Sequence, residues 1–119
     1  MRRLATTGGN IIDLASSDDF QRDVVDASQR VPVLVDFTAT WCPPCKMLKP
    51  RLEALATRHS SSMKLVKVDV DVCDQTAAAH RINAVPTVML YRGGKAVDQF
   101  QGLQSDEQLE TFVARHLKK

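Results

Sequence analysis

The residues best suited to carry chemistry are Cys42 and Cys45, which stand two prolines apart within Trp41–Lys46. An apolar run before them predicts a strand, and a leucine stripe after them predicts a helix. A first cysteine at such a junction lies at a helix N-terminus, where backbone N–H groups and the helix dipole stabilise a thiolate. The second lies one turn further on, close enough to attack a mixed disulfide. The pair therefore predicts thiol–disulfide exchange.

Two other interpretations of the cysteine pair are weaker. A zinc site needs about four ligands, but the chain has only one further cysteine, and its histidines, His59, His80 and His116, lack the spacing of a ligand pair. A purely structural disulfide would stabilise little across so short a loop. We therefore favour a redox pair and expect neither a metal nor a bound cofactor.

One carboxylate lies in the apolar run that precedes the motif. Asp36 falls within Val33–Phe37, where an ionised group is costly unless it has a partner or a task. It is either a proton acceptor for Cys45 or a strand-end residue that reaches solvent. Lys67, on the next strand, could be its charge partner or an exposed strand lysine.

The elements that must position these residues alternate along the chain. A helix is expected from about Ser16 to Ala27, and a longer one after the cysteine motif, kinked at Pro50. The other expected elements are strands over Val31–Phe37 and Lys64–Asp71, a short helix over Cys73–His80, a hairpin of Thr87–Arg92 with Ala96–Phe100, and a last helix from the capping box Ser105–Gln108. This order predicts an α/β fold with a mixed sheet.

Length and charge narrow the class of protein further. The 119 residues fit one domain, and the net charge of +2 is spread without a basic block. No apolar stretch approaches the roughly 18 residues that span a bilayer. We therefore expect a monomer that binds neither nucleic acid nor membrane.

The first nine residues differ from the rest. They contain Arg2 and Arg3, have no acidic residue and end in Gly8-Gly9, as a targeting segment or its remnant would. The alternative is a disordered tail. We expect a flexible segment over 1–9 before a domain over 10–119, with the mitochondrion as the destination and the cytoplasm as the alternative.

Taken together, these residues resemble the thioredoxin family over about Ile11–Leu117. The resemblance rests on these matches: Val35-Asp36-Phe37, Ala39, Trp41-Cys42-x-Pro44-Cys45-Lys46, Pro50, Lys67, Val85-Pro86-Thr87, Gly93-Gly94 and Gly102. It implies the thioredoxin fold, a central mixed β-sheet flanked by α-helices. It also implies that Cys42 attacks, Cys45 resolves, and Asp36 with Lys67 supports proton transfer.

The resemblance further implies a substrate groove and partners. Pro86 would be cis and face the cysteine pair, and the groove would be lined by Trp41, Pro44, Val85, Pro86 and Gly102. The activity would be that of a protein disulfide reductase. Its partners would be thioredoxin reductase, as electron donor, and disulfide-containing clients such as peroxiredoxins.

Pro43 departs from the family pattern, which usually has glycine there. A Cys-Pro-Pro-Cys motif looks like that of tryparedoxin, which passes electrons from a low-molecular-weight dithiol to peroxidases. The donor could therefore be thioredoxin reductase or such a dithiol. Cys73 lies near an accessory cysteine of some relatives; it is either oxidisable, permitting intermolecular disulfides, or an inert small residue.

Three other functions stay open from sequence alone. A more oxidising potential would make the chain a disulfide oxidase or isomerase. A scaffold role would make it a non-enzymatic binding module. A shared cysteine ligand would make it an iron–sulfur cluster-sharing protein.

Overall fold

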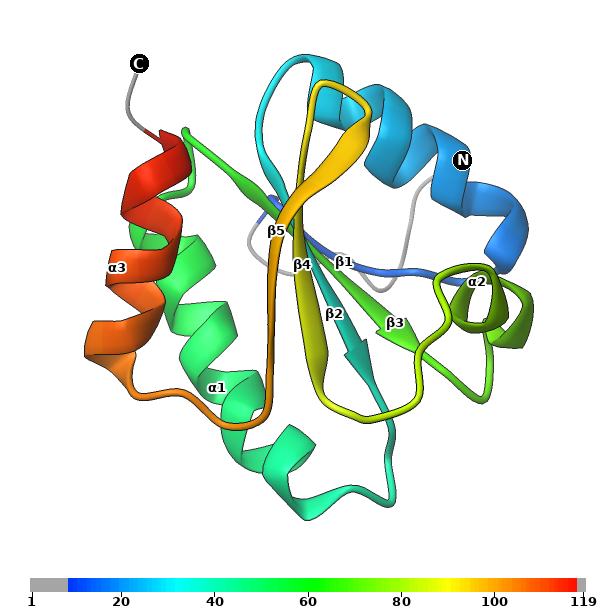
Figure 1. Ribbon diagram of the computed structural model, residues 1–119. Coiled ribbons are helices and arrows are strands. Elements are labelled where there is room, and N and C mark those ends of the chain that lie inside the picture. Colours follow the sequence, from blue (N-terminus) through cyan, green and yellow to red (C-terminus); the bar gives the residue numbers. More distant parts are fainter. Residues whose placement is uncertain (1–8, 118–119) are drawn as a thin grey trace.

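The computed structural model describes residues 9–117 and contains a five-stranded mixed sheet (Figure 1). Its order is β1-β3-β2-β4-β5, in which β1 and β2 run parallel to β3, and β4 is antiparallel to both β2 and β5. The strands are β1 (Ile11–Asp13), β2 (Val33–Thr38), β3 (Lys64–Asp69), β4 (Thr87–Arg92) and β5 (Lys95–Gln101). The predicted mixed α/β architecture is confirmed.

Helices cover both faces of the sheet (Figure 1). On one face lie α1 (Pro43–Arg58) and α3 (Asp106–Leu117), side by side; on the other lie α2 (Asp74–Ala79) and the helical segment that follows β1. Two separate apolar clusters result. Leu34 of β2 belongs to the cluster under α1 and α3, whereas its neighbours Val33 and Val35 belong to the opposite cluster. Strand β2 is therefore buried on both faces, as its continuous apolar run predicts.

The first helical segment differs from the single helix expected over Ser16–Ala27. It consists of a 3₁₀ turn η1 (Ser17–Asp19), a π-helical stretch η2 (Gln21–Asp26) and a second 3₁₀ turn η3 (Ala27–Gln29). The expected cap is present, because Ser16 Oγ accepts the Asp18 N–H at 3.1 Å. The spacing of apolar residues indicates a helical face but does not determine which carbonyl accepts each backbone N–H. The irregular hydrogen bonding therefore could not be predicted from that spacing.

The helices at the other positions follow their sequence signals closely. Helix α1 runs without interruption through Pro50; the kink expected there stays a prediction. Helix α3 begins with a reciprocal capping box, in which Ser105 Oγ accepts the Gln108 N–H and Gln108 Oε1 accepts the Ser105 N–H. The β4–β5 hairpin turns at Gly93-Gly94, both with positive φ. Strand β3 ends at Asp69, two residues before the expected end.

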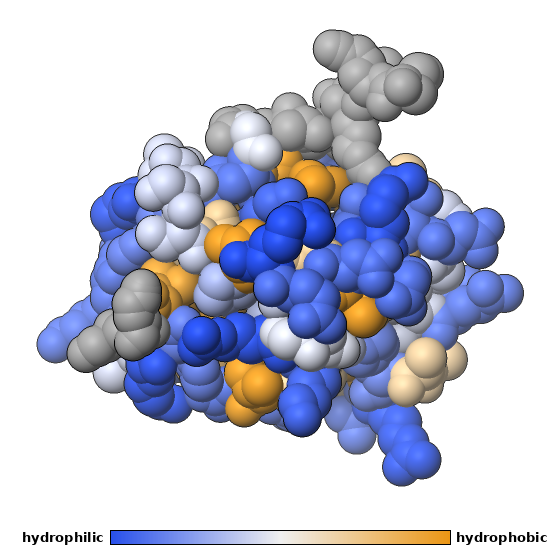
Figure 2. Space-filling view, turned by 90° about the horizontal axis from the view of Figure 1, so that it is seen from above, coloured by the Kyte–Doolittle hydropathy of each residue, from blue (hydrophilic) through white to orange (hydrophobic). Residues whose placement is uncertain are grey.

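The face of the molecule that carries the η segment and the β4–β5 turn is mainly hydrophilic, with apolar side chains only in small separate areas (Figure 2). None of the helices in residues 9–117 is long and apolar enough to cross a membrane.

Candidate functional site

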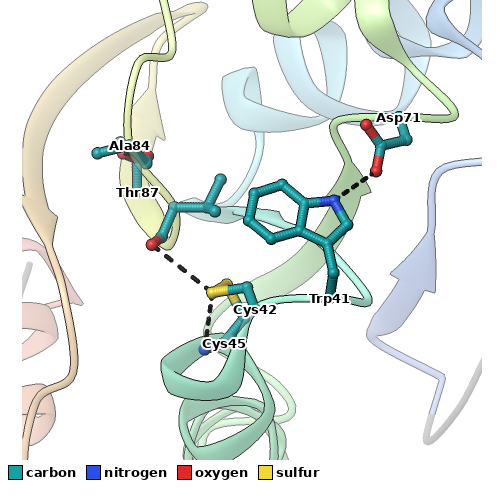
Figure 3. Close-up of a disulfide and its surroundings, with 7 residues drawn as sticks. Trp41, Cys42, Cys45, Asp71, Ala84 and Thr87 are labelled. Carbon is teal, nitrogen blue, oxygen red and sulfur yellow. Dashed lines mark hydrogen bonds between the residues drawn. A yellow bond between two sulfur atoms is a disulfide. The ribbon is translucent and has the colours of Figure 1, made fainter.

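The cysteine pair lies at the start of α1, shortly after the C-terminal end of strand β2 (Figure 3). Cys42 and Cys45 form a disulfide with their Cα atoms 5.3 Å apart. Cys42 is the N-cap residue of α1, and the Cys45 N–H donates to its Sγ at 3.2 Å. Pro43 and Pro44 fill the first helical positions, where a missing N–H leaves no helical hydrogen bond unmade. The N–H that contacts Sγ in the disulfide can stabilise a thiolate after reduction.

Both sulfur-bearing residues are largely covered. Cys42 is 3% and Cys45 2% exposed, and both pack in a small cluster with Ala39, against Val70 and Val85. The carbonyl oxygen of Val85 lies 3.6 Å from Cys42 Sγ. The loop that contains Val85 therefore lies directly beside Cys42.

That loop brings Val85 and Pro86 to the cysteine pair, and Gly102 joins them from the end of β5. The Val85–Pro86 peptide bond is cis, as the resemblance implies. Gly102 donates its N–H to the Pro86 carbonyl at 3.0 Å and has φ +86°, a conformation that glycine adopts without strain. Val85, Pro86 and Gly102 are thus linked to one another beside Cys42.

Trp41 forms the other border of the site. It is 64% exposed, and its Nε1–H donates to Asp71 Oδ2 at 2.8 Å (Figure 3). Asp71 is in turn held by its own N–H, which donates to Asp69 Oδ1 at 2.8 Å. Sequence reasoning placed Asp71 at the end of a strand and gave it no role. The indole N–H of Trp41 is a hydrogen-bond donor, but the sequence does not indicate which residue accepts from it.

Asp36 is buried in the sheet, 2% exposed. The alternative of a strand-end residue that reaches solvent is therefore wrong. Its Oδ1 has no hydrogen-bond partner among the described residues. Burial raises the pKa of Asp36 to about 7; the charge of Lys67 opposes this rise and the charge of Glu53 adds to it. Asp36 can therefore be ionised or protonated near neutral pH.

Lys67 does not form the direct ion pair with Asp36 that the sequence suggested. The two residues are register partners on β2 and β3. The Lys67 ammonium instead contacts Glu53 Oε2 at 2.5 Å and Asp13 Oδ1 at 3.2 Å. The exposed-lysine alternative is also wrong, since Lys67 is 8% exposed. Burial alone would lower the pKa of Lys67, but Glu53 and Asp13 together raise it above its usual value.

A cavity of about 440 Å³ connects these groups. It lies beside the N-terminal part of α1 and is lined by Asp13, Leu14, Asp36, Thr38, Ala39, Thr40, Cys45, Lys46, Lys49, Lys67, Asp69 and Val72. Asp36 and Cys45 therefore line the same cavity.

Cys73 lies apart from this chemistry. It is fully buried, packs in the cluster on the η-segment side, and its thiol donates to the Leu14 carbonyl at 3.6 Å. Burial, and then the charge of Asp69, raises the pKa of the Cys73 thiol. A buried thiol that resists ionisation is a poor nucleophile, so the structure favours the inert role over an intermolecular disulfide.

Comparisons with known proteins agree with this geometry. The family model described as Thioredoxin matches residues 11–115. The chain is 41% identical over 106 residues to "Probable thioredoxin-2" of Caenorhabditis elegans, covering 89% of this chain and 72% of that protein. It is 39% identical over 113 residues to "Thioredoxin, mitochondrial" of Rattus norvegicus, and this match covers 95% of this chain and 65% of the rat protein. For "Thioredoxin C-2" of Corynebacterium nephridii the identity is 38% over 102 residues, covering 86% and 93%. The chain thus spans just under two thirds of the rat relative's length.

Proposed function

Because this chain belongs to the thioredoxin family of thiol–disulfide oxidoreductases, we propose that it reduces disulfide bonds in other proteins through Cys42 and Cys45. The observation that carries the proposal is the disulfide at the start of α1, with the Cys45 N–H directed at Cys42 Sγ. This arrangement favours the thiolate of Cys42 in the reduced protein. It also leaves Cys45 within bridging distance.

The first step is attack by Cys42. Its thiolate forms a bond with one sulfur of a client disulfide, and the other client sulfur leaves as a thiolate that takes a proton. The approach is along the groove whose proposed lining is Trp41, Pro44, Val85, Pro86 and Gly102. In support, Trp41 and Pro44 are exposed beside Cys42. The linked Val85, Pro86 and Gly102 provide the opposite border.

The second step is resolution by Cys45. Its thiol passes a proton to the Asp36 carboxylate, and the resulting thiolate attacks Cys42 Sγ. The Cys42–Cys45 disulfide forms and the second client thiolate is expelled, so the client gains two electrons and the dithiol loses two. Asp36 suits this role because its pKa of about 7 lets it accept and release a proton at neutral pH. We propose that Lys67 acts on this step through its charge.

The same motif leaves two candidate electron donors. Proteins of this family are reduced by thioredoxin reductase, and we propose that donor here, with peroxiredoxins among the clients. Pro43 favours a second candidate, a tryparedoxin-like carrier reduced by a low-molecular-weight dithiol. Reduction by NADPH with thioredoxin reductase should exceed reduction by trypanothione or glutathione; the reverse order would support the second candidate.

For localisation we propose the mitochondrion, with the cytoplasm as the alternative. The support is that the rat, bovine and mouse relatives are named as mitochondrial, although the Corynebacterium and Nostoc relatives are bacterial. The proposed targeting segment, 1–9, lies almost wholly outside the described residues, and we keep 10–119 as the proposed domain.

The test of the proposed function is reduction of insulin disulfides by matched cysteine variants. Cys42→Ser should abolish turnover, and Cys45→Ser should accumulate mixed disulfides with clients. Cys73→Ser is the control, since its buried thiol has no part in the reaction, and it should turn over like the wild type. Normal turnover by Cys45→Ser would show that the resolving role is wrong.

A further inference from the structure

The Lys67 ammonium is closely held, but not by the carboxylate with which it is in register. Asp36 and Lys67 lie opposite each other on neighbouring strands, yet no salt bridge joins them among the described residues, and Asp36 Oδ1 has no hydrogen-bond partner there. Two other carboxylates contact the ammonium, Glu53 from α1 and Asp13 from β1. The ammonium is therefore paired with Glu53 and Asp13 and not with Asp36.

Glu53 reaches this position because of its place on α1. It follows Cys45 by eight residues and Lys49 by four, so the three lie along one side of the helix. Glu53 Oε2 also lies 3.8 Å from Lys49 Nζ, which places the carboxylate between two ammonium groups. Asp13, the register partner of Lys67 on β1, completes the set.

We propose that Glu53, assisted by Asp13, is a positioning residue that holds the Lys67 ammonium away from Asp36 and so keeps Asp36 a strong enough base to accept the Cys45 proton. This inference rests on the proposed role of Asp36 in resolution. It concerns two residues that contact neither the sulfur atoms nor Asp36 in the described contacts.

The physical reason is the strength of a short charge–charge contact at a buried site. An ammonium group within about 4–6 Å lowers the pKa of a carboxylic acid by roughly 1 to 3 units. Were Lys67 to turn onto Asp36, the carboxyl would lose much of the basicity that burial gives it. In the present arrangement the charge of Lys67 lowers the pKa of Asp36 and the direct charge of Glu53 raises it.

Several other charged and titratable groups around Asp36 could also affect its titration. Asp13 comes from β1, Lys67 and Asp69 come from β3, and Cys45, Lys46, Lys49 and Glu53 come from α1. From β4 the register partner of Asp36 is the apolar Val88. A titration in the oxidised protein removes the cysteines from this set, because a disulfide does not ionise.

The experiment is a titration of the Asp36 side-chain carboxyl by ¹³C NMR in the oxidised full-length protein. Glu53→Gln and Asp13→Asn, singly and together, should free Lys67 to approach Asp36. In the double variant the pKa of Asp36 should fall by about 1 unit or more. Glu107→Gln, at an exposed glutamate of α3 that does not line the cavity at Asp36, is the control for loss of one negative charge and should leave the titration unchanged.

A Lys67→Met background separates positioning from the direct charge of the two carboxylates. In this background, which lacks the ammonium, removing Glu53 and Asp13 should lower the pKa of Asp36 by less than about half of the fall seen when Lys67 is present. Equal falls in both backgrounds, or no fall with Lys67 present, would overturn the inference. Asp13 is half exposed, so its single variant should fold and keep the test decisive even if Glu53→Gln were unstable.

A second measurement links the titration to catalysis. The midpoint of the pH–rate profile for disulfide reduction should shift to lower pH in the double variant, and Lys67→Met should remove most of that shift. The NMR titration needs no turnover, so it can fail while the cysteine variants behave as proposed. Conversely, a chain that reduced no disulfide would still reveal whether Glu53 positions Lys67.

Discussion

At the scale of single residues, Asp36 is costly to ionise. Its side chain is buried beside apolar strands, where an ionised carboxylate loses its hydration. A structural residue at this position would be selected for stability, and an apolar side chain would serve better. The cost is understandable if Asp36 is retained for proton transfer, as proposed here.

That cost gives a prediction of stability against pH. The pKa of Asp36 is 3.8 for the unperturbed group and about 7 in the folded chain. Between these values the folded state binds more protons than the unfolded state, so this group makes stability fall as pH rises through the window and adds no further loss above about 7. The full penalty is about 4 kcal/mol.

Asp36→Asn should therefore unfold at higher denaturant concentration than the wild type, with little advantage at pH 4 and the full advantage, a few kcal/mol, at pH 8. Urea unfolding at several pH values measures it. Asp26→Asn, at an exposed carboxylate, is the matched control. An advantage of Asp36→Asn that did not grow with pH would show that Asp36 is not a buried, reluctant acid.

At the scale of elements, helices α1 and α3 begin in different ways. The N-cap of α1 is Cys42, a residue of the reaction, whereas α3 begins with a capping box whose two hydrogen bonds join only Ser105 and Gln108. The capping box contributes stability without contacting the groove residues. Changes there should therefore leave the chemistry intact.

Ser105→Ala should cost about 1 kcal/mol of unfolding free energy, because the Gln108 N–H loses its acceptor. Thr111→Ala, on the exposed side of the same helix, should be neutral or slightly stabilising, since alanine favours helix. Denaturant unfolding measures both, and insulin reduction at 25 °C should stay at the wild-type rate. A loss of activity in folded Ser105→Ala would mean that α3 takes part in the site.

At the scale of the whole molecule, one sheet serves two apolar clusters. Neighbouring residues of β2 point alternately into the cluster under α1 and α3 and into the cluster on the η-segment side. Both clusters contain side chains from the same strands, so loss of packing in one cluster exposes strands whose other face forms part of the second cluster. The domain should therefore unfold in one cooperative step.

Leu52→Ala tests this cooperativity. Leu52 is fully buried under α1, and its truncation should cost about 2–5 kcal/mol. Fluorescence of Trp41, the one tryptophan of the chain, and far-UV circular dichroism should shift to the same lower denaturant midpoint. Met47→Ala, at a 55% exposed position of the same helix, should shift neither. Separate midpoints for the two signals would contradict a single cooperative unit.

The sequence by itself was sufficient for the features that depend on neighbours along the chain. The apolar run of β2, the cysteine motif and the leucine stripe of α1 are contiguous, so local pattern places Cys42 at a helix start. The Gly93-Gly94 turn and the Ser105–Gln108 capping box are equally local. Short-range geometry is limited to a few solutions by backbone sterics, which is why these predictions were confirmed.

Only the tertiary structure decided which side chains meet across elements. In the structure Lys67 forms ion pairs with Glu53 and Asp13 and not with Asp36. The Trp41 indole N–H donates to Asp71. Cys73 is buried. These outcomes depend on strand order, on how α1 lies against the sheet and on the reach of long side chains. Charge partners are chosen by distance in space, and residues far apart in the sequence carry no local signal of that distance.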